Sequence, residues 1–237
     1  MSIVILPSEW VDSERSARFQ EFFGPLFKRA IDITLASIGM VILLPVFAAI
    51  AVGVKLDSPG PVFYSQERVG RNRRQRRDTL SSGKERRKAD AFGRPFMIYK
   101  FRTMVADAER HTGPVWASAQ DSRITPLGRF LRRSRLDETA QLWNVLRGDM
   151  SLVGPRPERP TFVQSLSVSL PDYPKRCGVL PGITGLAQVK SNYDTSVESV
   201  SRKLQYDLYY LKNGRLLLDI KIMAATVKVM AKGDGAH

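Results

Sequence analysis

The amino-acid sequence predicts a mostly helical α+β protein that is monotopic, entering a membrane from one side through a re-entrant broken helix. An apolar stretch over residues 33–54 carries no charge and is long enough to cross a bilayer, yet Pro45 lies near its centre. The 237-residue chain has a formal net charge of +14, and basic residues flank this stretch on both sides. We therefore expect an N-terminal lead-in over 1–27, a membrane helix-hairpin over 28–56 and a small cytoplasmic domain over 57–237.

The charges around the apolar stretch predict its topology. Lys28 and Arg29 precede it, and Lys55 and a strongly basic segment follow it. The positive-inside rule places both flanks in the cytoplasm, which favours a helix that breaks at Pro45 and returns. A straight spanning helix with a proline kink is the alternative. A secretory signal is not expected, because the apolar run starts late and no small-residue cleavage site follows it.

The composition limits the kinds of partner and metal ion that the chain is expected to bind. A strongly basic chain calls for an anionic partner, such as phospholipid head groups, phosphorylated substrates or nucleic acid. The single cysteine, Cys177, excludes an intrachain disulfide, and the two histidines make a histidine-based zinc site an unlikely choice. Oxygen ligands remain, and these favour magnesium.

A basic insert over 71–94 holds ten arginines and lysines and three acidic residues, which is half of the net charge of the chain. It can be a polybasic arm that contacts anionic membrane lipids. It can equally be a solvated loop without a fixed structure. Nucleic-acid binding is disfavoured, because the insert has no aromatic side chain before Phe92 on which a base could stack.

The cytoplasmic domain begins with two strand-like patterns. The first runs through 62–64, and the second, over 96–104, is a buried strand that brings Lys100 and Arg102 to its exit. Helical patterns follow over 105–110, 127–131, 162–170, 196–211 and 216–230. Two of these, 127–131 and 216–230, are amphipathic, so they can lie in the membrane interface or face the core of the domain.

The stretch over 128–158 carries the strongest chemical signal. It contains the adjacent carboxylates Asp137 and Glu138 after a cluster of four arginines, and it ends in a proline-bracketed Arg156. Ser134 and Asp137 fit a loose capping box, which would place Asp137 in the first turn of a helix. There the backbone N–H groups favour an ionised carboxylate. Such an aspartate can act as a nucleophile or a metal ligand toward a phosphorylated substrate, whereas the alternative is a capped surface helix with ordinary salt bridges.

Taken together, these motifs resemble the bacterial sugar transferase family, the small monotopic polyprenyl-phosphate phosphoglycosyl transferases. The resemblance runs from Lys28 to about Lys232. Its motifs, in chain order, are KRAID, SPGPVFYSQERVG, YKFRTM, DSRITPLGRFLR, LDETAQLWNVLRGDMSLVGPRPE and PGITGLAQV.

The resemblance implies a reaction and its site. A sugar 1-phosphate would pass from a UDP-sugar to undecaprenyl (polyprenyl) phosphate through a covalent intermediate on Asp137, with UMP leaving. Glu138 would be the second member of the catalytic pair, and both acids would hold Mg2+. Lys100, Arg102 and Arg156 match positions expected to bind phosphate.

The resemblance also implies a setting. The enzyme would lie on the cytoplasmic face of the bacterial inner membrane and begin exopolysaccharide or other glycoconjugate synthesis. Its partners would be the UDP-sugar, the polyprenyl phosphate and anionic membrane lipids, without nucleic acid, and a homo-oligomer stays open. A membrane-tethered basic binding or assembly protein without catalysis is the alternative, and no motif specifies the sugar.

Overall fold

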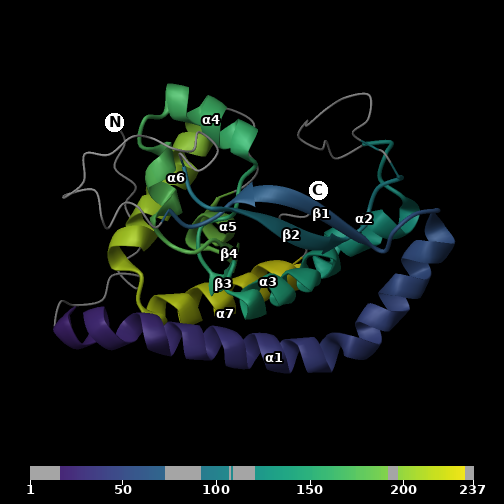
Figure 1. The fold of residues 1–237 in the computed structure, drawn as a ribbon, viewed down its shortest axis with the longest axis horizontal. Helices are drawn as coiled ribbons and strands as arrows, with labels where there is room; N and C mark the ends of the chain where they lie inside the picture. Colours follow the sequence, from purple (N-terminus) through teal and green to yellow (C-terminus); the bar gives the residue numbers. More distant parts are fainter. Residues whose placement is uncertain (1–16, 73–91, 107, 109–120, 192–196, 233–237) are drawn as a thin grey trace.

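A computed structural model describes residues 17–72, 92–106, 108, 121–191 and 197–232. The helices α1 to α7, the strands β1 to β4 and the 3-10 helices η4 and η5 follow one another in Figure 1. Their order is α1 (Ala17–Asp57), β1 (Phe63–Val69), β2 (Pro95–Phe101), α2 (Pro126–Arg133), η4 (Leu136–Gln141), α3 (Leu142–Arg147), β3 (Ser151–Val153), α4 (Pro160–Ser169), η5 (Tyr173–Gly178), β4 (Gly182–Thr184), α5 (Leu186–Lys190), α6 (Val197–Asn213) and α7 (Leu216–Lys232). The expected mostly helical α+β class is confirmed.

The helix α1 extends along one side of the molecule and then bends (Figure 1). Its part from Gly24 to Asp57 is long and apolar enough to cross a membrane by length and composition. Pro45 lies inside this helix, and a proline in a helix interior is an ordinary cause of a kink. The helical assignment continues through Pro45, so the expected break is a bend within one continuous helix. The same helix begins at Ala17, well inside the segment expected as a lead-in.

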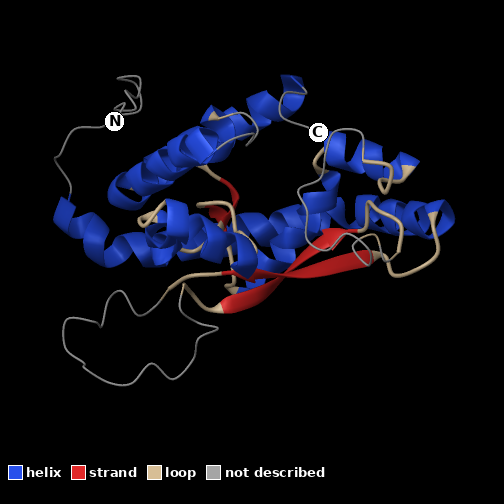
Figure 2. Ribbon diagram, turned by 90° about the horizontal axis from the view of Figure 1, so that it is seen from above, coloured by secondary structure: helices blue, strands red, loops and turns tan. Residues whose placement is uncertain are grey.

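The domain contains two small sheets. Strands β1 and β2 form an antiparallel pair in which Tyr64 lies opposite Lys100, and they run side by side in Figure 2. Strands β3 and β4 form a short parallel pair, with Ser151 opposite Gly182. Opposed residues of an antiparallel pair point to the same face, so Tyr64 and Lys100 lie on one face of the first sheet.

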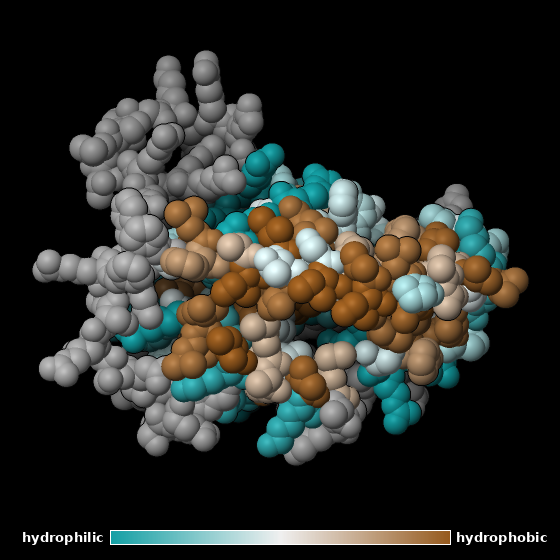
Figure 3. Space-filling model, turned by 90° about the horizontal axis from the view of Figure 1, so that it is seen from below, coloured by the Kyte–Doolittle hydropathy of each residue, from teal (hydrophilic) through white to brown (hydrophobic). Residues whose placement is uncertain are grey.

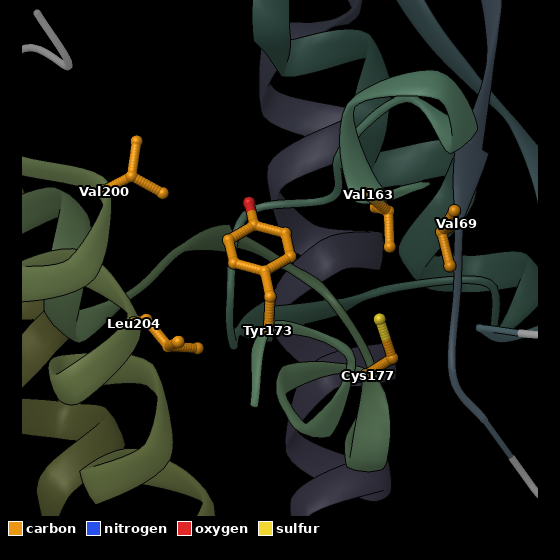
Figure 4. Close-up of a cluster of buried hydrophobic side chains, with 6 residues drawn as sticks. All are labelled: Val69, Val163, Tyr173, Cys177, Val200 and Leu204. Atoms are coloured by element: carbon orange, nitrogen blue, oxygen red, sulfur yellow. The ribbon is translucent and has the colours of Figure 1, made fainter. Parts of the chain in front are cut away.

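Four clusters of buried apolar side chains join these elements. In one of them, the Tyr173 ring lies between side chains from β1 and α4 and side chains from α6 (Figure 4). A second cluster packs the end of α1 on β2, α2 and η4, and here Phe47 meets Phe101 edge-on with 5.4 Å between the ring centres. The two other clusters join α5, α6 and α7 to β3, and α1 and α3 to β2.

The basic residues before the apolar stretch are bound to the domain. Lys28 Nζ lies 2.6 Å from an Asp219 carboxylate oxygen of α7. Arg29 donates to two carbonyl oxygens in the last turn of α3, and Asp32 accepts a hydrogen bond from the Leu152 N–H of β3. Cations at a helix C-terminus satisfy its unpaired carbonyl groups. This part of α1 therefore rests on the domain, and so does the end of the helix beyond Pro45.

An apolar band covers the face on which α1 lies (Figure 3). Along α1, exposed apolar side chains follow at short intervals: Leu26, Phe27, Ile33, Leu35, Ile38, Val41, Ile42, Leu44, Val52 and Leu56. On α7, which lies close to α1 in Figure 1, Leu216, Leu217, Ile220, Val227 and Met230 are also exposed. A contiguous apolar surface of this extent marks a membrane or protein contact.

Several expected elements differ in detail. The helical start expected over 105–110 does not form at Val105 and Ala106, and most of the rest lies outside the described residues. The basic insert also lies almost entirely outside them. The amphipathic α2 presents Leu131 to the core, as one of the two alternatives for this segment has it, and leaves Phe130 exposed.

Candidate active site

The acidic pair lies in η4, between α2 and α3. Asp137 and Glu138 are in the first turn of this 3-10 helix, and both are buried, at 6% and 8% exposed. Arg135 precedes them with a positive φ of 60°, which turns the chain sharply from α2 into η4. The expected placement in a first turn is therefore confirmed, although the helix is not an α-helix.

The expected capping box is wrong. Ser134 ends α2, and its hydroxyl donates to the carbonyl oxygens of Phe130 and Leu131 instead of capping η4. The position before η4 is Arg135, whose side chain makes no cap hydrogen bond. A left-handed residue at this junction leaves Ser134 on the preceding helix, and the sequence pattern does not signal that conformation.

Glu138 holds two cations from different parts of the chain. Its Oε1 atom lies 2.6 Å from Lys100 Nζ of β2 and 2.7 Å from Arg156 Nη2, just after β3. Arg135 approaches the other carboxylate oxygen at 3.9 Å. The structure thus brings together four of the residues expected in the site, although they come from three separate segments.

The pKa of Glu138 lies well below its usual range. Burial alone raises this pKa, but the charges of Arg156 and Lys100 and their hydrogen bonds outweigh burial. In turn, the charge of Glu138 raises the pKa of Arg156. Burial lowers the pKa of Lys100, and Glu138 opposes this effect. Glu138 therefore remains ionised and is committed to its cations.

Asp137 is in a different environment. Burial raises its pKa, the Lys100 charge opposes that rise, and the neighbouring Glu138 charge adds to it. Among the described residues, no donor forms a hydrogen bond with this carboxylate. An ionised carboxylate that is poorly solvated and not held by a donor is a stronger nucleophile than one in water.

The structure places Arg102 elsewhere. Its guanidinium donates to three carbonyl oxygens at the end of α1 and the following turn, those of Val54, Ser58 and Pro59. Gly60, with a φ of 125°, lies so close that a side chain there would meet the Arg102 guanidinium. This arrangement gives Arg102 a structural role and lends no support to the expected phosphate contact.

The polar side chains of Thr184 in β4 and Gln188 in α5 also serve the fold. The Thr184 hydroxyl pairs with Thr226 of α7 at 2.6 Å, and Gln188 donates to the Ile183 carbonyl. These contacts explain why the glycine-rich connection before α5 holds polar side chains.

Sequence reasoning missed a buried ion pair behind Arg156. Arg176 of η5 lies 2.8 Å from the Asp207 carboxylate of α6, and both side chains are almost fully buried. Arg176 also donates to the main-chain carbonyl of Arg156. The two partners are far apart in the sequence, so no local pattern could have revealed the pair.

The residues present fit a magnesium ion. Magnesium is held in proteins by one or two carboxylates together with substrate phosphates and water. Asp137 and Glu138 could supply such a pair, because Lys100 and Arg156 share the Oε1 atom of Glu138 and only Arg135, at 3.9 Å, approaches its other carboxylate oxygen. Among the described residues there is no group of three or more acidic, histidine or cysteine side chains that could hold a metal by itself. A metal here would therefore depend on the substrate.

A buried acid pair among fixed cations is an arrangement suited to phosphorylated ligands, and it lies in a domain that also carries a long apolar helix. The chain belongs to the bacterial sugar transferase family, whose sequence profile matches residues 23–233. The expected family is confirmed.

Individual relatives carry related names. A UDP-N-acetylgalactosamine-undecaprenyl-phosphate N-acetylgalactosaminephosphotransferase of Aeromonas hydrophila is 40% identical over 210 residues, covering 89% of this chain and 45% of that protein. Two UDP-glucose:undecaprenyl-phosphate glucose-1-phosphate transferases are also similar. The protein of Xanthomonas campestris is 41% identical, over 85% of this chain and 38% of its own length. The protein of Caulobacter vibrioides is 37% identical, over 90% of this chain and 72% of its own length.

Proposed function

We propose that this chain is a phosphoglycosyl transferase that moves a sugar 1-phosphate from a UDP-sugar to undecaprenyl phosphate, releases UMP and initiates polysaccharide synthesis. Family membership and the names of the relatives support the reaction. The observation that carries the mechanism is the difference between the environments of the two acids. Two cations neutralise Glu138, whereas Asp137 is buried beside them with a raised pKa.

The first half-reaction uses Asp137 as the nucleophile. One of its carboxylate oxygens attacks the phosphorus that bears the sugar, and the bond from that phosphorus to the UMP oxygen breaks. UMP leaves with the electron pair, and an aspartyl-phosphosugar remains. In the second half-reaction, a phosphate oxygen of undecaprenyl phosphate attacks the same phosphorus, and the acyl-phosphate bond breaks to restore the carboxylate.

The neighbouring cations make this attack feasible. A carboxylate approaching a diphosphate meets strong charge repulsion, which Lys100 and Arg156 reduce at short range. Arg132 adds positive charge, and its Nε atom donates to Thr103 at 2.9 Å. Glu138 fixes the Lys100 and Arg156 side chains, so the donor phosphates meet cations that are already in place.

Asp137 and Glu138 are also the residues that would hold Mg2+ together with the donor diphosphate. When bound, the ion would neutralise phosphate charge during the transfer.

The contacts of α1 support a monotopic arrangement. Lys28 binds Asp219 before the apolar stretch, and Arg102 binds the carbonyl oxygens of Val54 and Ser58 at its other end. Both flanks of the helix therefore contact the same domain. A helix that spanned a bilayer would separate its two ends by about 30 Å of hydrocarbon, which is incompatible with these contacts. We infer that α1 enters the membrane from the cytoplasmic face and keeps both ends there.

The experiment that tests the function measures UMP release by purified protein in detergent with undecaprenyl phosphate. The donors are UDP-N-acetylgalactosamine and UDP-glucose, chosen from the names of the relatives. We expect release with at least one UDP-sugar, dependence on Mg2+ and loss of at least about 100-fold in Asp137→Asn. Asp149→Asn removes an acid that pairs with Arg147 at the surface and should retain full activity.

A labelled donor sugar gives a direct test of the covalent step. Without undecaprenyl phosphate, label should remain on the wild-type protein after denaturation and be absent from Asp137→Asn. If Asp137→Asn keeps more than about a hundredth of the wild-type rate, Asp137 is not the nucleophile.

A further inference from the structure

The segment Pro155–Glu158, which carries Arg156, is held by an unusual set of hydrogen bonds. Its two prolines cannot donate from their main-chain nitrogen atoms, so the segment depends on its carbonyl groups. Four donors from different elements reach the four successive carbonyl oxygens: Gly182 N to Pro155 at 2.9 Å, Arg176 Nη2 to Arg156 at 2.9 Å, Arg68 Nη1 to Pro157 at 3.1 Å and Val69 N to Glu158 at 2.9 Å.

Arg176 is the donor that reaches the carbonyl of Arg156 itself. Its guanidinium is buried, with Nε 2.8 Å from the Asp207 carboxylate and Nη1 2.8 Å from the Tyr173 hydroxyl oxygen. Asp207 of α6 is only 2% exposed and balances the arginine charge. Asp207 and Tyr173 thus fix the guanidinium plane, and Nη2, which also contacts Asp207, donates to the Arg156 carbonyl.

The position of this contact matters for the catalytic site. A hydrogen bond to the carbonyl of Arg156 restrains the main chain from which its side chain projects. That side chain ends 2.7 Å from Glu138 Oε1, next to Lys100. A shift of the Arg156 main chain would move the guanidinium away from the donor phosphates, and a misplacement of about 1 Å can cost about 100-fold in rate.

We propose that Arg176, held by Asp207, is a positioning residue that acts on the reaction through Arg156. This proposal rests on the proposed function, because it assumes that Arg156 binds the donor phosphates. The energetics favour a geometric role: a buried ion pair contributes little net stability compared with packed apolar side chains of similar volume. A planar guanidinium, which can donate two parallel hydrogen bonds, is also the cation best suited to holding its partner in one orientation.

The first test is Arg176→Lys, which keeps the charge facing Asp207 but loses the planar fork. We expect kcat/KM for the UDP-sugar to fall about 10- to 100-fold, with KM raised as well as kcat lowered, since losing a supporting partner of a catalytic group has effects of this size. A smaller folded fraction would lower the apparent kcat and leave KM unchanged. Val163→Ala is the matched control, because Val163 packs in the same cluster as Tyr173 and should lower the melting temperature without changing KM.

The decisive test is a double-mutant cycle with Arg156→Lys. If Arg176 acts through Arg156, then Arg176→Lys should reduce kcat/KM less than about threefold in the Arg156→Lys background. Equal losses in both backgrounds would overturn the proposal, and so would an unchanged KM in the single variant. An Arg156→Lys variant with wild-type activity would remove Arg156 from the phosphate site, and the positioning role would fall with it.

Two milder variants guard against a failure of Arg176→Lys to fold. Asp207→Asn leaves the arginine in place with a neutral partner, and Tyr173→Phe removes one hydroxyl contact and keeps the ring. Both should raise KM for the UDP-sugar in proportion to their effect on kcat/KM, with Asp207→Asn the larger. A folded Asp207→Asn variant with wild-type KM would contradict the proposal.

Discussion

Asp137 and Glu138 are adjacent in the chain and both buried, yet their electrostatic environments are opposite. Two cations within 2.7 Å stabilise the ionised form of Glu138. Asp137 is ionised at a cost, since burial outweighs the charges that favour its ionised form. This asymmetry assigns nucleophilic attack to Asp137 and the organisation of the cations to Glu138.

The two acids should therefore respond oppositely to neutralising substitutions. Glu138→Gln leaves two cations without their partner and should lower the free energy of unfolding by about 1–3 kcal/mol at neutral pH. Asp137→Asn removes a destabilised charge and should raise the melting temperature, by about 2–4 °C for a gain of about 1 kcal/mol. Thermal unfolding in detergent measures both values.

The pH dependence of these differences follows from the directions of the two pKa shifts. The pKa of Asp137 is raised in the folded state, so stability is lost as the pH rises from the ordinary aspartate pKa to the folded value, and the advantage of Asp137→Asn should grow over that range. The pKa of Glu138 is lowered, so its contribution is present above the ordinary glutamate pKa and is lost as the pH falls toward the folded value. A stability gain for Asp137→Asn that grew on acidification would contradict this account.

Arg156→Lys tests the planar fork at the site. A lysine can keep one contact with Glu138, but it cannot present two parallel N–H groups to a phosphate. We expect kcat/KM for the UDP-sugar to fall at least about tenfold, while Glu138 remains ionised and the protein folded. Initial rates over a range of donor concentrations, with circular dichroism as a check on folding, measure this effect.

Much of this site could be predicted from the sequence, because its key residues lie in short motifs. The sequence itself shows that Asp137 and Glu138 are adjacent and that a proline stands on each side of Arg156. The phosphate contact expected for Arg102 was implied by the family resemblance, and the strand expected over 96–104 included Arg102, whereas β2 ends at Phe101. Beyond the strand, the alternation of faces no longer determines where a side chain points.

At the scale of elements, Arg102, which directly follows β2, holds the end of α1 and the turn after it. Its guanidinium satisfies carbonyl groups that a helix end leaves without partners. Arg102→Met should therefore lower stability by about 1–3 kcal/mol and leave the donor KM unchanged in the folded fraction. A raised KM with an unchanged melting temperature would instead support the expected phosphate contact.

Pro45 determines how the two parts of α1 reach the domain. Replacing it with alanine would restore a hydrogen-bond donor and favour a straighter helix, which would pull Phe47 away from Phe101 or Lys28 away from Asp219. We expect Pro45→Ala to lower UMP release about tenfold or more in native membranes. Pro25→Ala is the matched control, because Pro25 lies in the same helix before the first of these contacts and should have a smaller effect.

The elements differ in how well local patterns predicted them. Alternation and turn residues indicated β1 and β2, and helical spacing indicated α6 and α7. The pairing of β3 with β4 was not predictable, because each strand has only three residues and the two lie far apart in the chain. The 3-10 form of η4 depends on the left-handed Arg135, a conformation that an arginine rarely adopts.

At the scale of the whole molecule, the apolar and polar surfaces are separated. The exposed apolar side chains of α1 and α7 cover one side (Figure 3), and Lys28 and Arg29 are bound to the domain. These two basic residues attach α1 to the elements that carry the acid pair and Arg156, so the position of the helix and the position of the site are coupled.

This coupling predicts that both flanks of α1 lie on the cytoplasmic side. Ser8 and Ser82 lie outside the described residues but flank the helix in the sequence, so single cysteines there, in a Cys177→Ser background, report on the two sides. Both should resist a membrane-impermeant thiol reagent in intact cells and react after the cells are opened, because Lys28 on one flank of the apolar stretch and Arg102 at its other end hold α1 on one domain. Labelling of the Ser8 position alone in intact cells would mean that α1 spans the bilayer. The contacts of Lys28 with Asp219 could not then form in the membrane, and the monotopic arrangement would have to be abandoned.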